Sequence, residues 1–335
     1  MRLTVRTEAW PLAAPFRITG YVFETAEVVT ATLSDGEATG LGEASGVYYR
    51  GEIVEGLRAG LEAARPYVEG GLDREGLRAL LPAGGVRNAL DTALWDLESQ
   101  RAGAPVWALA GLETVKPLTT TLTISAGTPA ETADAARAWS DARAIKLKLT
   151  AEDPAACVAA VRAARPDVWL GVDANQGLNR TSLEALIPTF VDARVALIEQ
   201  PLPVGEDAAL DGLSSPIDIA ADESCQTMAD IAGLAGRYHV VNLKLDKCGG
   251  LTEGLLMAAE ARRLGLKVMV GCMSGTSLAM APAFVLGQLA DIVDLDSPLF
   301  LAKDRQTSAT YDDGQIWCPS ELWGGGQRVR QGETA

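Results

Sequence analysis

Charged side chains recur at a nearly constant interval through the middle of this 335-residue sequence. Each comes at the end of a short run of β-prone residues, and the five are Lys148, Asp173, Glu199, Asp222 and Lys244. The intervals between them are 25, 26, 23 and 22 residues, which suit one strand followed by one crossover helix. A repeating strand–helix unit would therefore bring all five to one carboxyl end, where the active sites of α/β barrels form.

Three carboxylates at one barrel mouth repel each other unless a cation lies between them. Because hard divalent cations prefer oxygen ligands, we expect Asp173, Glu199 and Asp222 to bind Mg²⁺, with Mn²⁺ as an alternative. Any one of these acids alone is readily explained as a helix cap or the partner of a lysine. Three at consecutive strand ends favour a metal site.

The two lysines, Lys148 and Lys244, precede and follow the three acids, so we expect them on opposite sides of the metal. Neighbouring cations would lower their pKa toward the working range of a general base. Two such bases would reach a carbon acid from either face. The metal would bind the substrate carboxylate and stabilise the enediolate formed when the α-proton leaves.

The run AIKLKLT shows how a strand would present these bases. Alternate residues of a strand face opposite sides, so Lys146 and Lys148 share one face and apolar residues share the other. By the same count, Lys244 shares its face with Asn242 and Asp246. We expect the apolar faces to meet helices and the polar faces to point into the barrel. Lys146 would contact the substrate carboxylate and lower the pKa of Lys148, the alternative being an ion pair.

The order of the elements predicts an α/β fold. Eight β-prone runs follow residue 116, joined by seven connections of a length suited to parallel crossovers. An eight-stranded α/β barrel is favoured, and a doubly wound open sheet is the alternative.

The chain before the barrel reads as a separate α+β domain over 1–115, with the barrel over 116–303. A hairpin turn is expected at 34–36, and helical spacing extends over 52–68 and from 85 to the stop at Gly103 and Pro105. The tail, 304–335, is expected to pack back on the first domain.

Composition excludes several classes of protein. A net charge of −15 disfavours nucleic acid and anionic membranes as partners. No apolar run reaches the roughly 18 residues of a membrane span, and no signal peptide is expected. Five scattered cysteines without CxxC spacing argue against disulfides and structural zinc and favour a cytoplasmic location. The single histidine, His239, cannot support a His-dependent triad.

The runs KLK, VDAN, IEQP, ADES and NLKLDKCGG, in this order and spacing, resemble the enolase superfamily. More narrowly they resemble its muconate-lactonizing-enzyme subgroup, over nearly the whole chain. The resemblance implies an α+β capping domain on a modified (β/α)7β barrel, and lysine bases acting with Mg²⁺, as is known for this superfamily. It assigns Lys148 and Lys244 as the acid/base pair, and Asp173, Glu199 and Asp222 as the metal ligands.

Within the subgroup, the run DLD with Asp294 and Asp296 is similar to the Asp-x-Asp of dipeptide epimerases, which binds the substrate α-ammonium. A solvated or helix-capping acid pair is the alternative. The resemblance implies a Mg²⁺-dependent dipeptide epimerase, an isomerase acting at the α-carbon of the C-terminal residue of a small substrate. N-acylamino acid racemase and o-succinylbenzoate synthase are alternatives on the same scaffold, and a non-catalytic metal-binding barrel is a third. Assembly as a homo-oligomer is left open.

The loop over 17–25, RITGYVFET, corresponds by position to the mobile lid of the family. Epimerases acting on Ala-Glu resemble RGSR or RGSK there, with a basic residue for the glutamate side chain. Here Tyr21 and Phe23 favour an apolar or aromatic substrate side chain, and Glu24 leaves a cationic one open. The run GCMSGTS corresponds to the loop after the seventh strand, and the expected pocket residues in it are Cys272, Met273 and Ser274. The cysteine is expected as a wall of the pocket and not as a nucleophile.

Overall fold

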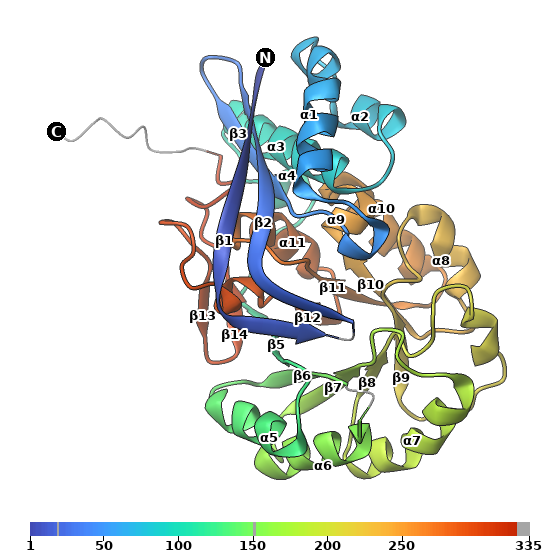
Figure 1. The fold of residues 1–335 in the computed structure, drawn as a ribbon. Coiled ribbons are helices and arrows are strands. Elements are labelled where there is room, and N and C mark those ends of the chain that lie inside the picture. The colour runs from blue at the N-terminus through green and yellow to red at the C-terminus, as the bar shows by residue number, and fades with distance from the viewer. Residues whose placement is uncertain (19, 150–151, 327–335) are drawn as a thin grey trace.

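Eight parallel strands form a barrel in the computed structural model, which describes residues 1–18, 20–149 and 152–326 (Figure 1). The strands are β5 (Thr121–Ile124), β6 (Ala144–Lys148), β7 (Trp169–Asp173), β8 (Leu197–Glu199), β9 (Asp218–Ala221), β10 (Val240–Lys244), β11 (Lys267–Gly271) and β12 (Ile292–Asp294). They pair in chain order from β5 to β12. The first and last strands also lie next to each other, and Thr121 of β5 donates a hydrogen bond to Asp294 of β12. The predicted barrel is therefore confirmed, and the open sheet is excluded.

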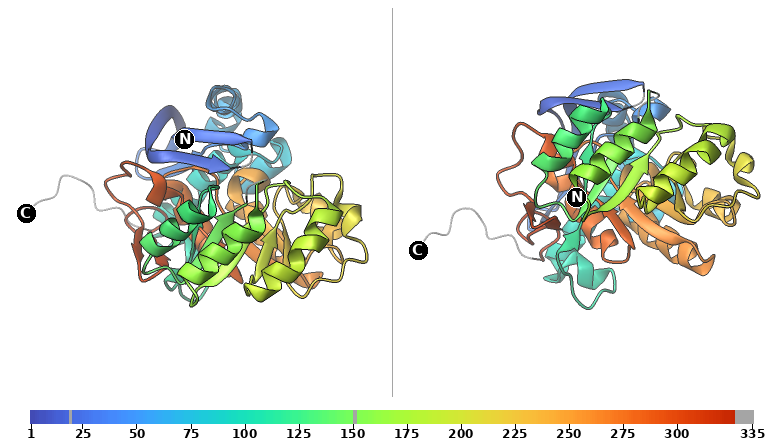
Figure 2. Two further views of the ribbon diagram at one scale, coloured as in Figure 1. Left: turned by 60° about the horizontal axis from the view of Figure 1, so that its bottom comes forward. Right: turned by 90° about the horizontal axis from the view of Figure 1, so that it is seen from below.

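Helices cover the outside of the barrel (Figure 2). They are α5 (Pro129–Ala138), α6 (Pro154–Ala164), α7 (Arg180–Asp192), α8 (Met228–Leu234), α10 (Leu251–Arg263) and α11 (Ser277–Gly287). The connection from β8 to β9, described in full, differs because its helical part is only a 3₁₀ turn at Asp207–Leu210. None of the helices in the described ranges has the length and apolar character needed to span a membrane.

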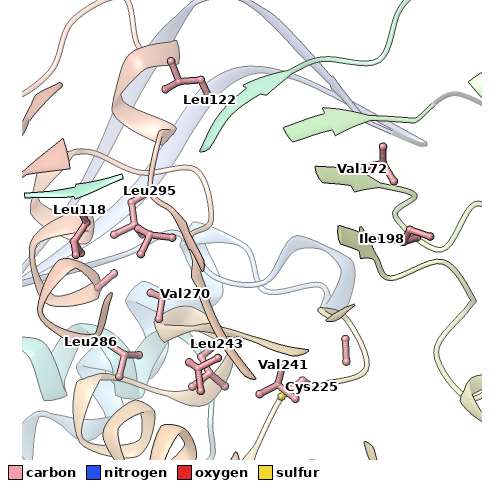
Figure 3. Close-up of a cluster of buried hydrophobic side chains, with 14 of the residues drawn as sticks. Leu118, Leu122, Val172, Ile198, Cys225, Val241, Leu243, Val270, Leu286 and Leu295 are labelled. Carbon is pink, nitrogen blue, oxygen red and sulfur yellow. The ribbon is translucent and has the colours of Figure 1, made fainter. Parts of the chain in front are cut away.

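Strand alternation separates the main core from the barrel interior. Outward-facing side chains pack in the core between strands and helices, and include Val172, Ile198, Val241, Leu243 and Val270 (Figure 3). Inside the barrel, a buried apolar floor is formed by Leu197, Ala220, Val240 and Met269. The residues two positions after this floor, and after Ile292, which packs against it, are polar where they are not glycine: Glu199, Asp222, Asn242 and Asp294. The charges therefore gather at the carboxyl end, as alternation predicts.

An antiparallel sheet and the helices packed on it form the capping domain. The strands are β1 (Arg2–Ile18), β2 (Tyr21–Ser34) and β3 (Thr39–Ala44), and the helices are α1 (Val54–Glu69), α2 (Arg74–Leu80) and α3 (Gly85–Ala102). The turn predicted at 34–36 does connect β2 to β3, with the Asp35 amide 3.2 Å from the Ala38 carbonyl oxygen. The long β1–β2 hairpin changes register between Pro11 and Phe16 and bends, so that its end lies across the barrel (Figure 1).

Two glycines allow β3 to lie directly against the backbone of α3. A Cβ atom on Gly40 would stand 2.0 Å from the Ala93 carbonyl oxygen, and one on Gly42 would stand 2.0 Å from the Ala89 carbonyl oxygen. Because these neighbours are helix backbone, they cannot move aside as a flexible side chain does. The TGLG run is therefore a packing requirement of the capping domain.

We expect Gly40→Ala to lower the free energy of unfolding by about 1–3 kcal/mol, the usual cost of overpacking. Gly56 in α1 provides a matched control, because an added Cβ there meets no atom within 4 Å. Gly56→Ala should be neutral or stabilising, since alanine favours helix more than glycine does. Urea unfolding of the two variants checks this, and equal stability would contradict the close approach of β3 and α3.

The C-terminal segment joins the two parts of the chain. After α4 (Val106–Leu109), the chain forms β4 (Leu118–Thr119), and the late strands β13 (Thr310–Asp312) and β14 (Gln315–Trp317) complete a small antiparallel sheet with it. Arg305 donates to Glu43 Oε2 at 2.6 Å and to Glu8 Oε2 at 2.8 Å in the cap. Glu43 also accepts the Thr276 amide at 2.7 Å, so the cap is bound to the loop after β11. The domain limits given above stay predictions.

Candidate active site

The five residues predicted from their spacing lie together at the carboxyl end of the barrel. The strand register pairs Lys148 with Asp173, and Asp173 with Glu199. Asp222 directly follows β9, and Lys244 is the last residue of β10. Three strands separate β6 from β10 in either direction around the barrel. The two lysines therefore approach its centre from opposite sides.

Both lysines are ion-paired with acids of the set. Lys148 Nζ lies 2.6 Å from Asp173 Oδ2, and Lys244 Nζ lies 2.7 Å from Asp222 Oδ2. A further lysine, Lys247 in the short helix α9 (Leu245–Cys248), lies 2.6 Å from Asp222 Oδ1. The sequence did not identify Lys247 as a residue of the site, because its contact with Asp222 depends on a helix that begins directly after the strand.

Glu199 shows why a cation fits between these acids. Its Oε1 accepts the Asn242 amide at 2.7 Å, whereas Oε2 is buried without a hydrogen-bond partner in the described part of the chain. Burial, followed by the charge of Asp173, raises the pKa of Glu199 to about 8. A buried carboxylate oxygen of this kind, beside other carboxylates, suits a hard cation.

The side chains do not yet form a closed ligand set. Within the described residues, no group of three acidic, cysteine or histidine side chains is already arranged to hold a metal ion. Asp173 and Asp222 instead direct their Oδ2 atoms toward Lys148 and Lys244. The donor types therefore fit a divalent cation, while the ion pairs show which contacts would have to exchange.

Lys146 lies among three of the carboxylates. Its Nζ donates to Asp294 Oδ2 and lies 3.6 Å from Glu199 Oε2 and 3.8 Å from Asp173 Oδ2. Asp294 also accepts a hydrogen bond from Thr121 Oγ1. The ion pair considered from the sequence is thus present, and it is buried. Contact of Lys146 with a substrate carboxylate stays a prediction.

The protein's own charges raise the pKa values of Lys244 and Lys146. For Lys244, burial lowers the pKa, Asp222 and Glu199 raise it, and the net result lies well above the ordinary value. Lys146 shows the same balance, with Asp294 as the largest raising influence. The lowering expected for the Lys244 pKa from neighbouring cations therefore does not occur with the charges of the protein alone. A divalent cation at the same carboxylates would offset their charge.

Asp296, the other acid of the predicted pair, has a different environment from Asp294. It lies between β12 and the 3₁₀ turn Ser297–Phe300, and its Oδ2 accepts the Thr123 amide at 2.6 Å. Burial, followed by the charge of Asp294, raises the pKa of Asp296 to about 6. Both acids line the same cavity. Because Lys146 already neutralises Asp294, Asp296 is the carboxylate of the pair better placed to receive a cationic group.

A cavity of about 240 Å³ lies between the barrel mouth and the β1–β2 hairpin. Its charged lining residues are Glu27, Glu52, Lys146, Lys148, Asp222, Lys244, Asp294 and Asp296. The apolar part of its wall includes Phe16, Ile18, Phe23, Ile53, Val54, Met273 and Phe300. Asp173 and Glu199 do not line the cavity and lie completely buried.

The structure brings only some of the predicted loop residues to this cavity. The lining includes Phe23, Cys272, Met273 and Ser274, but neither Tyr21 nor Glu24. Tyr21 instead packs its ring against Tyr48 of the 3₁₀ turn Tyr48–Arg50, with 4.7 Å between ring centroids. Glu24 is exposed on the face of β2 opposite to Phe23. Burial, followed by Asp294, raises the pKa of Cys272 above its usual range, as fits a pocket wall and not a nucleophile.

Two acids were placed incorrectly or missed by sequence reasoning. Asp246 was assigned to the inward face of a strand, but β10 ends at Lys244, and Asp246 accepts the Ser45 amide of the cap at 3.1 Å. Glu27 was not identified, although it lines the cavity. Strand alternation was the available signal, because Glu27 lies on the same face of β2 as Phe23.

The fold and the site define a capped α/β barrel with carboxylates and opposed lysines at its carboxyl end. Residues 1–111 match the family model of the mandelate racemase / muconate lactonizing enzyme N-terminal domain. Residues 130–329 match the enolase C-terminal domain-like family. The chain belongs to the enolase superfamily, as its motifs predicted.

Relatives within the superfamily include epimerases and racemases of amino acid derivatives. The chain is 40% identical over 311 residues to L-Ala-D/L-Glu epimerase of Escherichia coli, covering 92% of this chain and 97% of that protein. It is 44% identical over 246 residues to N-acetyl-D-glutamate racemase of a Pseudoalteromonas species, covering 73% of this chain and 78% of that protein. A solved enolase family member from Agrobacterium tumefaciens, with homology to dipeptide epimerases, superposes with a TM-score of 0.93 at 42% identity, covering 96% of this chain and 99% of that one. That structure contains bound sodium and L-Ala-L-Glu, with an ordered loop.

Proposed function

We propose that this protein is a dipeptide epimerase, an isomerase that moves a proton at the α-carbon of the C-terminal residue. The observation that carries the proposal is one cavity with Lys148 and Lys244 on opposite sides and the Asp294–Asp296 pair on its lining. Opposed bases serve a reaction that must remove a proton from one face of a carbon and return it to the other. The named relatives support the same class of isomerase.

We propose Mg²⁺ as the cofactor, held by Asp173, Glu199 and Asp222. When bound, the ion supplies positive charge that stabilises the negative charge developing on the substrate carboxylate. One of the two lysines, Lys148 or Lys244, takes the α-proton as a neutral amine, and the other, as an ammonium, donates a proton to the opposite face. In the reverse direction the two exchange roles.

The rest of the substrate is held by the fixed charges of the cavity. Lys146 is a buried cation beside the acids of the site, and it binds the carboxylate of the substrate. Asp296, with Asp294 behind it, receives the α-ammonium of the N-terminal residue. An N-acylamino acid, the substrate type of the alternative racemase reaction, carries no ammonium at that position. A buried acid pair favours the dipeptide for that reason.

Deuterium incorporation tests this proposal directly. Incubation with Mg²⁺ and a dipeptide library in D₂O should exchange the α-proton of the C-terminal residue, as seen by NMR and mass spectrometry. N-acetylated amino acids with the same C-terminal residues serve as matched comparisons. If only the N-acetyl compounds exchange, the protein is an N-acylamino acid racemase and not a dipeptide epimerase. If no compound exchanges, both assignments are refuted.

The cavity walls also predict which C-terminal side chains are accepted. Apart from the charged residues at the barrel mouth, the wall is mainly apolar, and two acids of the capping domain, Glu27 and Glu52, also line it. Glu27 is exposed and Glu52 is half-buried, so an anionic substrate side chain beside them would meet unfavourable like charge that solvent partly screens. We therefore propose a preference for apolar side chains at the C-terminal residue. This preference differs from the name of the Escherichia coli relative, an L-Ala-D/L-Glu epimerase, and from the L-Ala-L-Glu bound in the Agrobacterium structure.

We expect kcat/KM for L-Ala-L-Leu to exceed that for L-Ala-L-Glu by about 10-fold or more, corresponding to at least about 1.4 kcal/mol. Glu27→Gln should narrow this difference by removing one of the repelling charges. Epimerisation rates measured by polarimetry or NMR at several substrate concentrations check the ratio. An enzyme that prefers L-Ala-L-Glu, with a ratio unchanged by Glu27→Gln, would contradict the role given to this wall.

A further inference from the structure

Each of the three acids proposed as metal ligands has one oxygen held by a group other than the catalytic lysine pair. The holding groups are the Asn175 backbone amide for Asp173 Oδ1 (2.9 Å), Lys247 Nζ for Asp222 Oδ1 (2.6 Å) and Asn242 Nδ2 for Glu199 Oε1 (2.7 Å). The second oxygen of each acid meets Lys148 or Lys244, or, for Glu199, has no hydrogen-bond partner within the described residues. The three carboxylates are therefore each oriented by a contact on one side.

Asn242 is the neutral side chain among these holding groups. It is completely buried on the inward face of β10, two residues before Lys244, and it reaches past β9 to Glu199 on β8. Its own Oδ1 has no hydrogen-bond partner within the described chain. Burying an amide with an unpartnered oxygen is unfavourable, so a gain in stability alone does not explain an asparagine at this position.

The neighbouring strand leaves room for the Asn242 amide. A Cβ atom on Gly271 of β11 would stand 2.8 Å from Asn242 Oδ1 and 3.0 Å from Nδ2. The same atom would stand 3.1 Å from Lys244 Cε. A side chain on β11 at this height would thus displace the amide that holds Glu199.

We infer that Asn242 is a positioning residue for the metal site, fixing Glu199 Oε1 so that Oε2 alone is presented to the ion. This inference rests on the metal site given in the proposed function. Groups that orient a metal ligand from behind typically change metal affinity by about 10- to 100-fold when removed. Asn242→Leu keeps the approximate size of the side chain and removes the donor.

Binding of Mn²⁺, without substrate, tests this role on the full-length protein by titration calorimetry or EPR. Asn88→Leu is the matched control, because Asn88 is also a buried amide (2% exposed), but its Nδ2 donates to the Glu43 carbonyl oxygen in the cap at 3.4 Å. We expect wild type and Asn88→Leu to bind Mn²⁺ equally. We expect Asn242→Leu to bind it about 10- to 100-fold more weakly.

The outcomes separate this inference from the function on which it rests. If wild type binds Mn²⁺ and Asn242→Leu binds it with the same affinity, the positioning role is overturned and the metal site stands. If Asn88→Leu is weakened as much as Asn242→Leu, a general loss of stability explains both and the inference is also overturned. Wild type that binds no Mn²⁺ refutes the metal site itself. Asn242→Ser, which shortens the side chain beyond reach of Glu199, should show the same weakening and serves if Asn242→Leu does not fold.

Discussion

Lys148→Met and Lys244→Met should each strongly reduce epimerisation while each retaining proton exchange with one epimer only. Removing one base leaves the opposite lysine able to take and return a proton on its own face of the α-carbon. It cannot deliver a proton to the other face. A positioned acid/base group contributes about 10²- to 10⁴-fold to a rate, so the loss of epimerisation should be in that range.

The two variants should exchange opposite epimers, because β6 and β10 lie across the barrel from each other. Loss of the α-proton signal in D₂O, measured separately for L-Ala-L-Leu and L-Ala-D-Leu, gives both rates. Lys267→Met is a suitable control, since Lys267 is an exposed lysine of β11 that pairs with Asp218. If both lysine variants exchanged the same epimer, the two amines would not flank the α-carbon, and the two-base mechanism would be untenable.

The charged end of the barrel could be predicted because it depends on two regular quantities. Strand alternation decides that Lys146 and Lys148 point to the same side, and it needs no knowledge of distant residues. The repeat of one strand and one helix brings Asp173 and Glu199 to the same height as Lys148, which the register shows. Both follow from local spacing, and therefore both were readable in the sequence.

Contacts that depend on how the barrel closes were not readable in this way. Lys146 pairs with Asp294, 148 residues away in the chain, because β12 comes beside β5. The cavity wall depends on the bend of the β1–β2 hairpin, which decides that Phe23 faces the barrel. Local spacing also failed at Asp246, where α9 begins directly after Lys244 and the expected strand stops. The glycine after that helix, Gly249 with φ of 85°, was the available signal for a helix end.

Asp296→Asn should remove the preference for a substrate with a free α-ammonium. The clean comparison is L-Ala-L-Leu against N-propionyl-L-leucine, which differ only in the amino group of the first residue. A hydrogen bond to a charged group contributes about 1.5–3 kcal/mol, so kcat/KM for the dipeptide should fall by about 10- to 150-fold.

Asp296 is the better position for this test than Asp294, because Asp294 also neutralises Lys146 and its loss would disturb the carboxylates behind it. Asparagine at 296 still offers an oxygen to the Thr123 amide, so the local fold should be retained. Exchange of the α-proton in D₂O measures both substrates under the same conditions. The expected result is a large loss for the dipeptide and little change for the propionyl compound. An equal loss for both would mean that Asp296 supports the structure of the site without binding the ammonium. No loss for either would leave the Asp294–Asp296 pair without a part in substrate selection, and would return the N-acylamino acid racemase to consideration.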